Sequence, residues 1–205
     1  MRTGEAFINN RGLLLSDFGY DPDSGQVEYT RNGIVFYHYT RPERLEEILA
    51  RGGGLRACLS VPIPDPPPEL VGCHLVEGLL EPLPQWLVDS PYFGDLGLEM
   101  MREYIGDVLL RIEVPVDFPG LYVSDYAHVL DCKHLCRRGR SALSLDYDCS
   151  TGRECEKAQV NSYIAITDYR GGHVAPNVKV VRKGEGIAVP RDYISIAKTQ
   201  PLGGG

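Results

Sequence analysis

The sequence lacks any apolar run close to the roughly 20 residues that a membrane-spanning helix needs. Near its N-terminus only Leu13–Leu15 form an apolar core and no small-residue cleavage site follows, so we expect no signal peptide. With 43% hydrophobic and 24% charged residues, the composition is that of a globular protein and excludes a disordered chain. We therefore expect a cytoplasmic protein with no membrane partner, although an effector delivered into another cell would share these features.

Two common motifs of ligand sites are also missing. The chain has neither the glycine fingerprint nor the parallel βαβ order of a dinucleotide-binding Rossmann unit. Its six cysteines include no Cys-x-x-Cys pair of the kind that most structural zinc sites use. Without a secretion signal, we expect free thiols rather than disulfides. Zinc bound by Cys132, Cys136, Cys149 and Cys155 is kept as an alternative, and no metal is expected at the functional site.

Positive charge is scarce overall and unevenly distributed. The chain has 21 Lys+Arg against 28 Asp+Glu, a net charge of -7, which disfavours general nucleic-acid binding because phosphate neutralisation dominates that affinity. From Tyr169 onward, however, six basic residues oppose two acidic ones. A second basic cluster comprises Lys133, Arg137, Arg138 and Arg140. Such local patches fit a small anion such as a nucleotide pyrophosphate, or are simply solvated charge.

The 23 glycines and 15 prolines predict many turns and short strands rather than a helical bundle. Alternating or β-branched runs predict strands over residues 34–37, 108–114, 121–124, 161–166 and 178–181, and residues 189–196 supply a last short element. We expect an irregular arm over residues 1–30 and a loop over residues 139–158. The chain should therefore form one α+β domain with a compact split sheet.

Two helices are predicted. The first begins with a capping box of Thr40 and Glu43, continues with an apolar stripe, and ends at Gly52–Gly54. The second covers residues 97–105. The first helix follows the strand segment Phe36-Tyr37-His38-Tyr39-Thr40 directly, so His38 lies at a strand end beside a helix N-terminus. A histidine there can bind a ribose while helix amides face a phosphate, or it can be a half-buried core residue.

Three stretches resemble the motifs of the ADP-ribosyltransferase superfamily, in its histidine-bearing branch of diphtheria-type toxins, poly-ADP-ribose polymerases, rifamycin-modifying enzymes and DarT-type DNA modifiers. Tyr37-His38-x-Thr40, with the helix and the Gly52 turn behind it, resembles the first motif. Residues 120–127 resemble the second, a strand that carries an aromatic residue followed by Ser or Thr. Residues 163–172, 176–178 and 190–194 resemble the third.

The resemblance covers about half of the chain and implies a fold and a set of site residues. It implies one domain over residues 1–205 with a split antiparallel sheet, one or two helices, and an insertion at residues 56–119. NAD would be the substrate, with His38, Tyr122 and Asn177 as the catalytic residues. His38 would hold the adenosine-side ribose and Tyr122 would stack on the nicotinamide. The cofactor-binding set implied is His38, Tyr39, Thr40, Tyr122, Ser124, Tyr126 and Ser162.

One position departs from the family pattern. Asn177 stands where the family usually has glutamate, and an alternative alignment places Ser162 there, so neither register supplies a carboxylate. The loss of one electrostatic stabiliser typically lowers an enzyme's rate by about a hundredfold to a thousandfold. Nearby acids that could substitute are Glu154, Glu156, Asp168 and Glu185.

Two hypotheses follow for function. In the first, the protein transfers ADP-ribose from NAD to an unknown protein, nucleic-acid or small-molecule acceptor, or hydrolyses NAD, as a toxin-like effector with an immunity or other partner protein. In the second, it is a catalytically degenerate module of the same fold that binds a nucleotide or a protein.

Overall fold

The computed structural model describes residues 26–61, 66–82, 106, 108–130, 136, 138–140 and 147–197. The strands are β1 (Glu28–Thr30), β2 (Gly33–Thr40), β3 (Gly54–Ala57), β4 (Leu59–Ser60), β5 (Cys73–Leu79), β6 (Val108–Val114), β7 (Leu121–Asp125), β8 (Ile164–Ala165), β9 (Pro176–Lys183), β10 (Gly186–Pro190) and β11 (Ile194–Ile196). The helices are α1 (Pro42–Leu49), α5 (Ala127–Leu130) and α6 (Gly152–Asn161), with 3-10 turns η2 (Pro68–Leu70) and η4 (Arg191–Tyr193). The second predicted helix lies outside the described residues.

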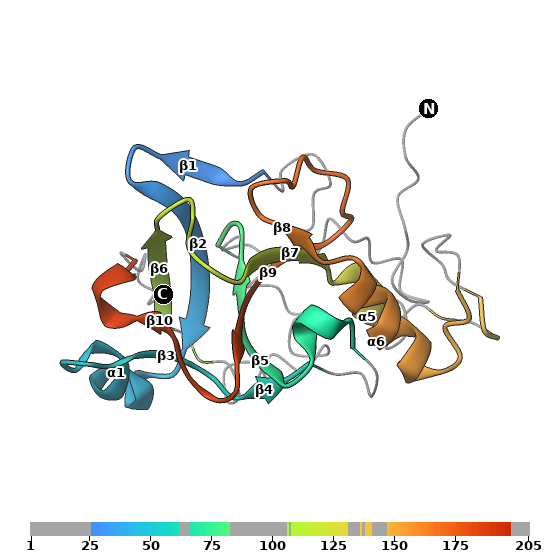
Figure 1. Cartoon of the computed structure of the whole chain (residues 1–205), viewed down its shortest axis with the longest axis horizontal. Coiled ribbons are helices and arrows are strands. Elements are labelled where there is room, and N and C mark those ends of the chain that lie inside the picture. Colours follow the sequence, from blue (N-terminus) through green and yellow to red (C-terminus); the bar gives the residue numbers. More distant parts are fainter. Residues whose placement is uncertain are drawn as a thin grey trace, which may run out of the picture.

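One large sheet organises these elements (Figure 1). Its strand order is β11-β6-β2-β5-β9-β7-β8, with β1 added to β2 and β4 added to β5, while β3 and β10 form a separate two-stranded sheet. Every pairing among the described strands is antiparallel. The prediction of an α+β domain with an antiparallel sheet is therefore confirmed.

The sheet is almost divided between β2 and β5. β2 pairs with β6 from Ile34 to Thr40, but with β5 only through Tyr37 and Leu79. Gly78 lies at this junction, and a Cβ there would be 2.9 Å from both the Phe36 ring and the Tyr37 carbonyl oxygen. Only a residue without a side chain lets the strands approach this closely. Two half-sheets, β11-β6-β2 and β5-β9-β7-β8, therefore meet at one narrow contact (Figure 1).

The main core lies on one side of both half-sheets. Strand residues of alternating position, such as Phe36, Ile112, Val123 and Val178, are fully buried there. Helix α1 adds Ile48, and β3 and β10 complete the cluster. Each fully buried side chain of this size contributes roughly 1.5–3 kcal/mol, so this layer provides most of the stability.

The opposite side of the sheet, which we call the polar face, is different. Its central residues are Tyr37, Arg111, Leu79, Glu77, Lys179, Asn177, Tyr122 and Ser124. Towards the far end of β5 and β9 the same side becomes apolar, where Leu75 and Val181 contact Leu70 of η2 and Val160 of α6. The polar face is thus bounded by a second, smaller core under α6.

Several expected elements need correction. The arm ends earlier than residue 30, because β1 pairs with β2. The capping box does not form, since Thr40 is the last residue of β2 and the helix N-cap is Arg41, which makes no side-chain cap bond. Residues 139–158 were expected to be a loop and 161–166 a strand, but α6 occupies Gly152–Asn161 and only Ile164–Ala165 form β8. Helix α6 has no apolar stripe at helical spacing, because only Cys155, Gln159 and Val160 are buried, so hydrophobic periodicity does not predict it.

The segment expected to be an insertion contributes to the centre of the sheet. Within residues 56–119 the structure describes β4, β5 and β6, and the last two are the neighbours of β2 on its two sides. This part of the range therefore belongs to the sheet itself.

The five described cysteines divide into two groups, and Cys132 lies outside the described residues. Cys58 and Cys73 are free thiols, as expected. Cys136 and Cys149, however, form a disulfide, and Cys155 on α6 is also disulfide-bonded. The prediction of free thiols is wrong for these three, and the zinc alternative loses their thiolates as ligands. Among the helices that the structure describes, none is long and apolar enough to cross a membrane.

Candidate functional site

A single row of side chains crosses the polar face through both half-sheets. In register, Arg111 of β6 pairs with Tyr37 of β2, and Tyr37 pairs with Leu79 of β5. Leu79 then pairs with Asn177 of β9, and Asn177 with Ser124 of β7. Two sequence-predicted site residues, Ser124 and Asn177, are therefore direct cross-strand neighbours.

A second row lies beside it and carries the charged pair of the site. Glu77, Lys179 and Tyr122 are in register on β5, β9 and β7. Lys179 donates a hydrogen bond to Glu77 Oε1, and the two side chains are 1% and 44% exposed. Burial lowers the pKa of the Lys179 ammonium, and the Glu77 charge opposes that shift. The lysine is thus inside the protein while its carboxylate partner reaches the surface.

Tyrosine rings surround this ion pair. The Lys179 Nζ lies 6.0 Å from the centre of the Tyr126 ring, a cation–π distance. The rings of Tyr122 and Tyr163 have centroids 6.0 Å apart. Burial raises the pKa of both Tyr126 and Tyr163, and the negative charge of Glu77 raises them further. Glu77 therefore lies within electrostatic reach of two neutral phenols, in a setting suited to a flat aromatic or sugar ligand.

Asn177 presents an unused hydrogen-bond acceptor. Its side chain is 8% exposed, and its Oδ1 has no hydrogen-bond partner in the described structure. Its backbone carbonyl accepts a long bond of 3.4 Å from the fully buried Ser124 hydroxyl. A buried amide oxygen without a partner is costly, and the cost is relieved when a ligand hydroxyl or a water donates to it. Ser124 itself is fully buried.

His38 occupies the opening between the half-sheets rather than the polar face. Its Nδ1 is 2.7 Å from the Glu77 carbonyl oxygen. Because a carbonyl only accepts, we assign the proton to Nδ1. Burial lowers the pKa of His38, with the Glu77 carbonyl and charge opposing it, so the ring is neutral near pH 7. His38 therefore ties the backbone of Glu77 to β2.

The two residues after His38 differ in access. Tyr39 lies on the polar face, in register with Leu109. Thr40 is buried, and the backbone at Gly106 passes so close that a Cβ there would lie 2.2 Å from the Thr40 carbonyl. The structure thus places Tyr39, but not Thr40, where a ligand on the polar face could reach it.

Asp125 fixes the end of β7 and the position of Tyr126. Its carboxylate accepts backbone N–H bonds from Ala127, Val174 and Ala175, at 3.0 Å each. The Ser162 hydroxyl accepts the Asp125 N–H at 2.8 Å and donates to the Gln159 carbonyl at 2.6 Å. The hydroxyl of Ser162, a predicted cofactor ligand, is therefore used within the fold.

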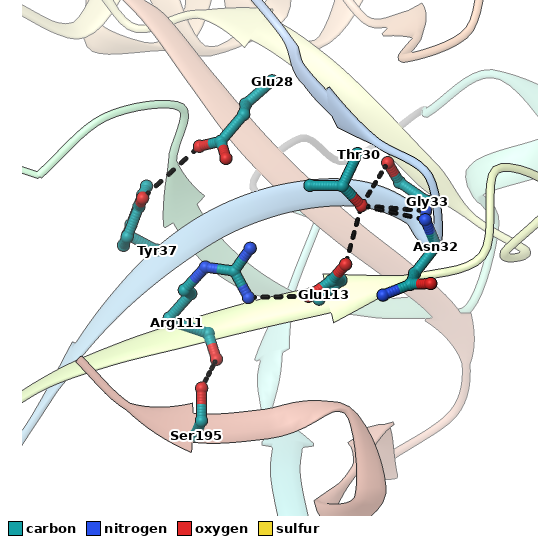
Figure 2. Close-up of polar contacts among 8 residues, drawn as sticks. All are labelled: Glu28, Thr30, Asn32, Gly33, Tyr37, Arg111, Glu113 and Ser195. Carbon is teal, nitrogen blue, oxygen red and sulfur yellow. Dashed lines mark hydrogen bonds and ion pairs between the residues drawn. The ribbon is translucent and has the colours of Figure 1, made fainter.

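A second polar cluster extends the first row onto the other half-sheet (Figure 2). Arg111 donates to Glu113 at 2.7 Å, and Thr30 donates to Glu113 at 2.6 Å. Both bonds lower the pKa of Glu113, and the bond from Thr30 has the larger effect. The Tyr37 hydroxyl points to Glu28 at 3.5 Å. The polar face therefore carries a half-exposed guanidinium and a phenol beside the Glu77 row.

The sequence patterns do not indicate Glu77 or Tyr163 as site residues, or Lys179 as a buried one. The acids named from the sequence lie elsewhere: Glu154 and Glu156 are exposed on α6, Asp168 is in an exposed turn, and Glu185 is 3.8 Å from His74 at the sheet edge. Alternation within Cys73–Leu79 was the one signal that could have placed Glu77 on a strand. Of the predicted basic patches, the described Arg138 and Arg140 are exposed, whereas Lys179 is inside.

Comparison with known proteins identifies no relative: no family model matches the chain, and no curated protein or solved structure is significantly similar to it. The residues of the polar face are therefore the basis on which a function can be assigned.

Proposed function

We propose that this protein binds NAD on the polar face and cleaves the bond between nicotinamide and ribose, passing ADP-ribose to an acceptor or to water. One observation carries the proposal. Tyr122 and Asn177 come from separate stretches of sequence that resemble two different ADP-ribosyltransferase motifs. They lie on adjacent strands of one face, beside a half-exposed carboxylate, Glu77.

The side chains fit the chemical needs of that bond cleavage. Tyr122 and Tyr163 offer ring faces for the nicotinamide. The Asn177 Oδ1 has no partner but is buried, so it would accept a ribose hydroxyl once the residues that cover it move aside. Cleavage of a glycosidic bond passes through an oxocarbenium-like transition state, so negative charge at Glu77 would stabilise it.

The step balances without a further reactant. The C–N glycosidic bond breaks, and nicotinamide leaves with the electron pair of that bond. The acceptor, a hydroxyl, amine, ring nitrogen or water, forms the new bond to the ribose carbon and loses a proton. With water, the products are nicotinamide, ADP-ribose and one proton.

Proton NMR of the wild-type protein mixed with NAD tests binding and turnover in one sample. We expect saturation transfer to the adenine and nicotinamide protons, followed by the signals of free nicotinamide. Tyr122→Ala should weaken binding about tenfold, because base–aromatic stacking contributes about 1–3 kcal/mol. Tyr29→Ala is the matched control, since Tyr29 is exposed on β1 and bonds to Ile166 on the core side.

Absence of transfer from every NAD proton in the wild type would contradict the proposal. Transfer without nicotinamide release would instead support the second hypothesis, a binding module, which the amide at position 177 favours. In that case Asn177→Glu, which adds a carboxylate beside Leu79 and Ser124, should create or raise nicotinamide release.

A further inference from the structure

We propose that Lys179 is a positioning residue, which holds the Glu77 carboxylate in the orientation that faces a ligand on the polar face. The inference depends on the proposed function, because it assigns the group that orients the carboxylate of that same site. Lys179 itself is inaccessible and touches no ligand.

Glu77 is held at two points. Its carbonyl oxygen accepts the bond from His38 Nδ1, and its Oε1 accepts the bond from Lys179. The described structure gives Oε2 no hydrogen bond, and the side chain is 44% exposed. One carboxylate oxygen is therefore used to fix the group, and the other is available to a ligand. A glutamate with free rotation about its side-chain bonds would lose this orientation.

Packing alone gives no reason for a lysine at this position. On its own face of β9 the neighbours are Asn177 and Val181, which are both buried, and Val181 belongs to the smaller apolar core. An apolar residue at position 179 would avoid the desolvation of an ammonium group, and buried ion pairs replaced by apolar residues are often neutral or better for stability. Groups that are costly to bury and lie beside a partly exposed carboxylate are concentrated at functional sites.

The surroundings of Lys179 also favour a single direction for its ammonium group. The Tyr126 ring lies 6.0 Å from Nζ, and Tyr126 is itself anchored because its N–H donates to the Ala175 carbonyl. Tyr122 is the in-register neighbour on the other side. The Tyr126 ring thus lies near the ammonium group, and Glu77 is its charged partner among the described residues, which favours one geometry for the pair.

The experiment compares wild type, Glu77→Gln, Lys179→Met and the double variant by rates of nicotinamide release and by binding of NAD. Each single variant should lower kcat by about a hundredfold to a thousandfold, with little change in KM. The double variant should be no slower than Glu77→Gln, because Lys179 acts only through Glu77. A purely structural lysine would instead give independent, multiplying losses. In a protein that binds NAD without turnover, the same four proteins are compared by dissociation constant, with the same non-additivity expected.

Two further variants keep the test decisive if Lys179→Met is poorly folded. Lys179→Arg retains a charged donor and should keep more activity than Lys179→Met at equal stability. Lys183→Met is the matched control on the same strand and face, because its Nζ is exposed and donates only to the Val71 carbonyl. If the wild type turns over NAD and Lys179→Met has the same kcat, the inference about Lys179 is wrong while the proposed function stands. The same holds if the losses in kcat of the two single variants multiply in the double variant. No NAD binding by the wild type overturns the proposed function and the inference with it.

Discussion

His38 illustrates how a residue at the site can be important without facing a ligand. Alternation along β2 places it on the side of Phe36, yet its ring reaches across the opening to the Glu77 carbonyl. The opening exists because β2 and β5 pair only at Tyr37 and Leu79. His38 thus substitutes a side-chain hydrogen bond for the backbone bonds that the diverging strands no longer make.

The lowered pKa of His38 predicts a loss of stability in weak acid. Above its ordinary pKa of 6.5 the ring is neutral in both folded and unfolded states. Below pH 6.5 the unfolded chain binds a proton that the folded protein resists, so the free energy of unfolding falls until the folded-state pKa is reached. The slope from one group is at most about 1.4 kcal/mol per pH unit. Urea denaturation between pH 8 and pH 5 measures it.

Replacing the histidine should remove that slope. His38→Gln keeps a donor for the Glu77 carbonyl and has no titrating group, so its stability should change less between pH 6.5 and pH 5. His173→Gln is the control, because His173 contacts the Ser162 carbonyl away from the opening. In this variant His38 is intact, so the loss of stability that His38 causes below pH 6.5 should remain. An identical slope in His38→Gln would show that the acid sensitivity comes from other residues.

For single residues, the sequence could predict which residue types belong to the site, but not which side chains they contact. Tyr122 and Asn177 were singled out from their local motifs, and the structure brings them to one face. Lys179 is one of the six basic residues after Tyr169, and the sequence does not show that it is buried, because each strand residue in isolation can face either side. Its burial follows from the register with Glu77 and Tyr122, which involves three strands far apart in sequence. Single-chain patterns contain no direct information on such registers.

Helix α6 buries few apolar side chains along its ten residues. Only Cys155, Gln159 and Val160 are buried, and the Gln159 Nε2 has no partner in the described structure. The helix is held instead by the disulfide of Cys155, by Val160 on the smaller core, and by the bond between Ser162 and Asp125. Tyr163 follows the C-terminus of α6 and lies beside Tyr122 on the polar face. Cross-links replace the hydrophobic stripe that most surface helices use.

Reduction should therefore loosen α6 before it loosens the sheet. The Cys136–Cys149 link joins cysteines 13 residues apart, and closing a loop of this size stabilises a protein by about 3 kcal/mol in the chain-entropy model. A dithiol reductant would convert each disulfide to two thiols and itself become a cyclic disulfide. We expect faster hydrogen exchange in α6, little change in β2 and β6, and weaker NAD binding through loss of Tyr163.

The matched control is Cys58→Ser, which removes an exposed free thiol and should behave as wild type before and after reduction. Cys155→Ser, which removes the disulfide on α6 itself, should reproduce the effect of reduction on the helix without reductant. If reduced and oxidised protein show the same exchange rates in α6, tertiary packing rather than cross-linking holds the helix.

Element prediction worked where the pattern was local. Strands β2, β6, β7 and β9 carry alternating or β-branched runs, and each was placed within a few residues. The capping box failed because Thr40 continues in β2 to complete its pairing with Val108. Helix α6 was missed because its stability comes from a disulfide and from contacts with residues distant in sequence, such as the bond between Ser162 and Asp125. In both cases a tertiary interaction overrode the local preference.

For the whole molecule, the narrow junction of the half-sheets sets the shape of the site. β11-β6-β2 carries Tyr37, Tyr39 and Arg111, and β5-β9-β7-β8 carries the Glu77 row. The polar face is continuous only because the two meet at Gly78. The split sheet and the antiparallel order were expected from the sequence, but the strand that makes the junction, β5, was not.

Gly78→Ala should drive the half-sheets apart. The new Cβ would lie 2.9 Å from the Phe36 ring and from the Tyr37 carbonyl, and the backbone oxygen cannot rotate away. Overpacking of this kind costs about 1–3 kcal/mol. The displacement would also move Glu77 relative to His38, so NAD binding should weaken. Urea denaturation and NAD titration measure the two effects on one preparation.

The matched substitution is Gly152→Ala at the start of α6, where an added Cβ meets nothing within 4 Å. It should leave stability and NAD binding unchanged or improve stability slightly, because alanine favours the helix. A large loss in Gly78→Ala with none in Gly152→Ala would show that the close approach at the junction, rather than glycine in general, is what the fold requires. Equal stability of the two variants would mean that the half-sheets accommodate a methyl group at their contact, and the polar face would then owe its shape to α6 and β1 instead.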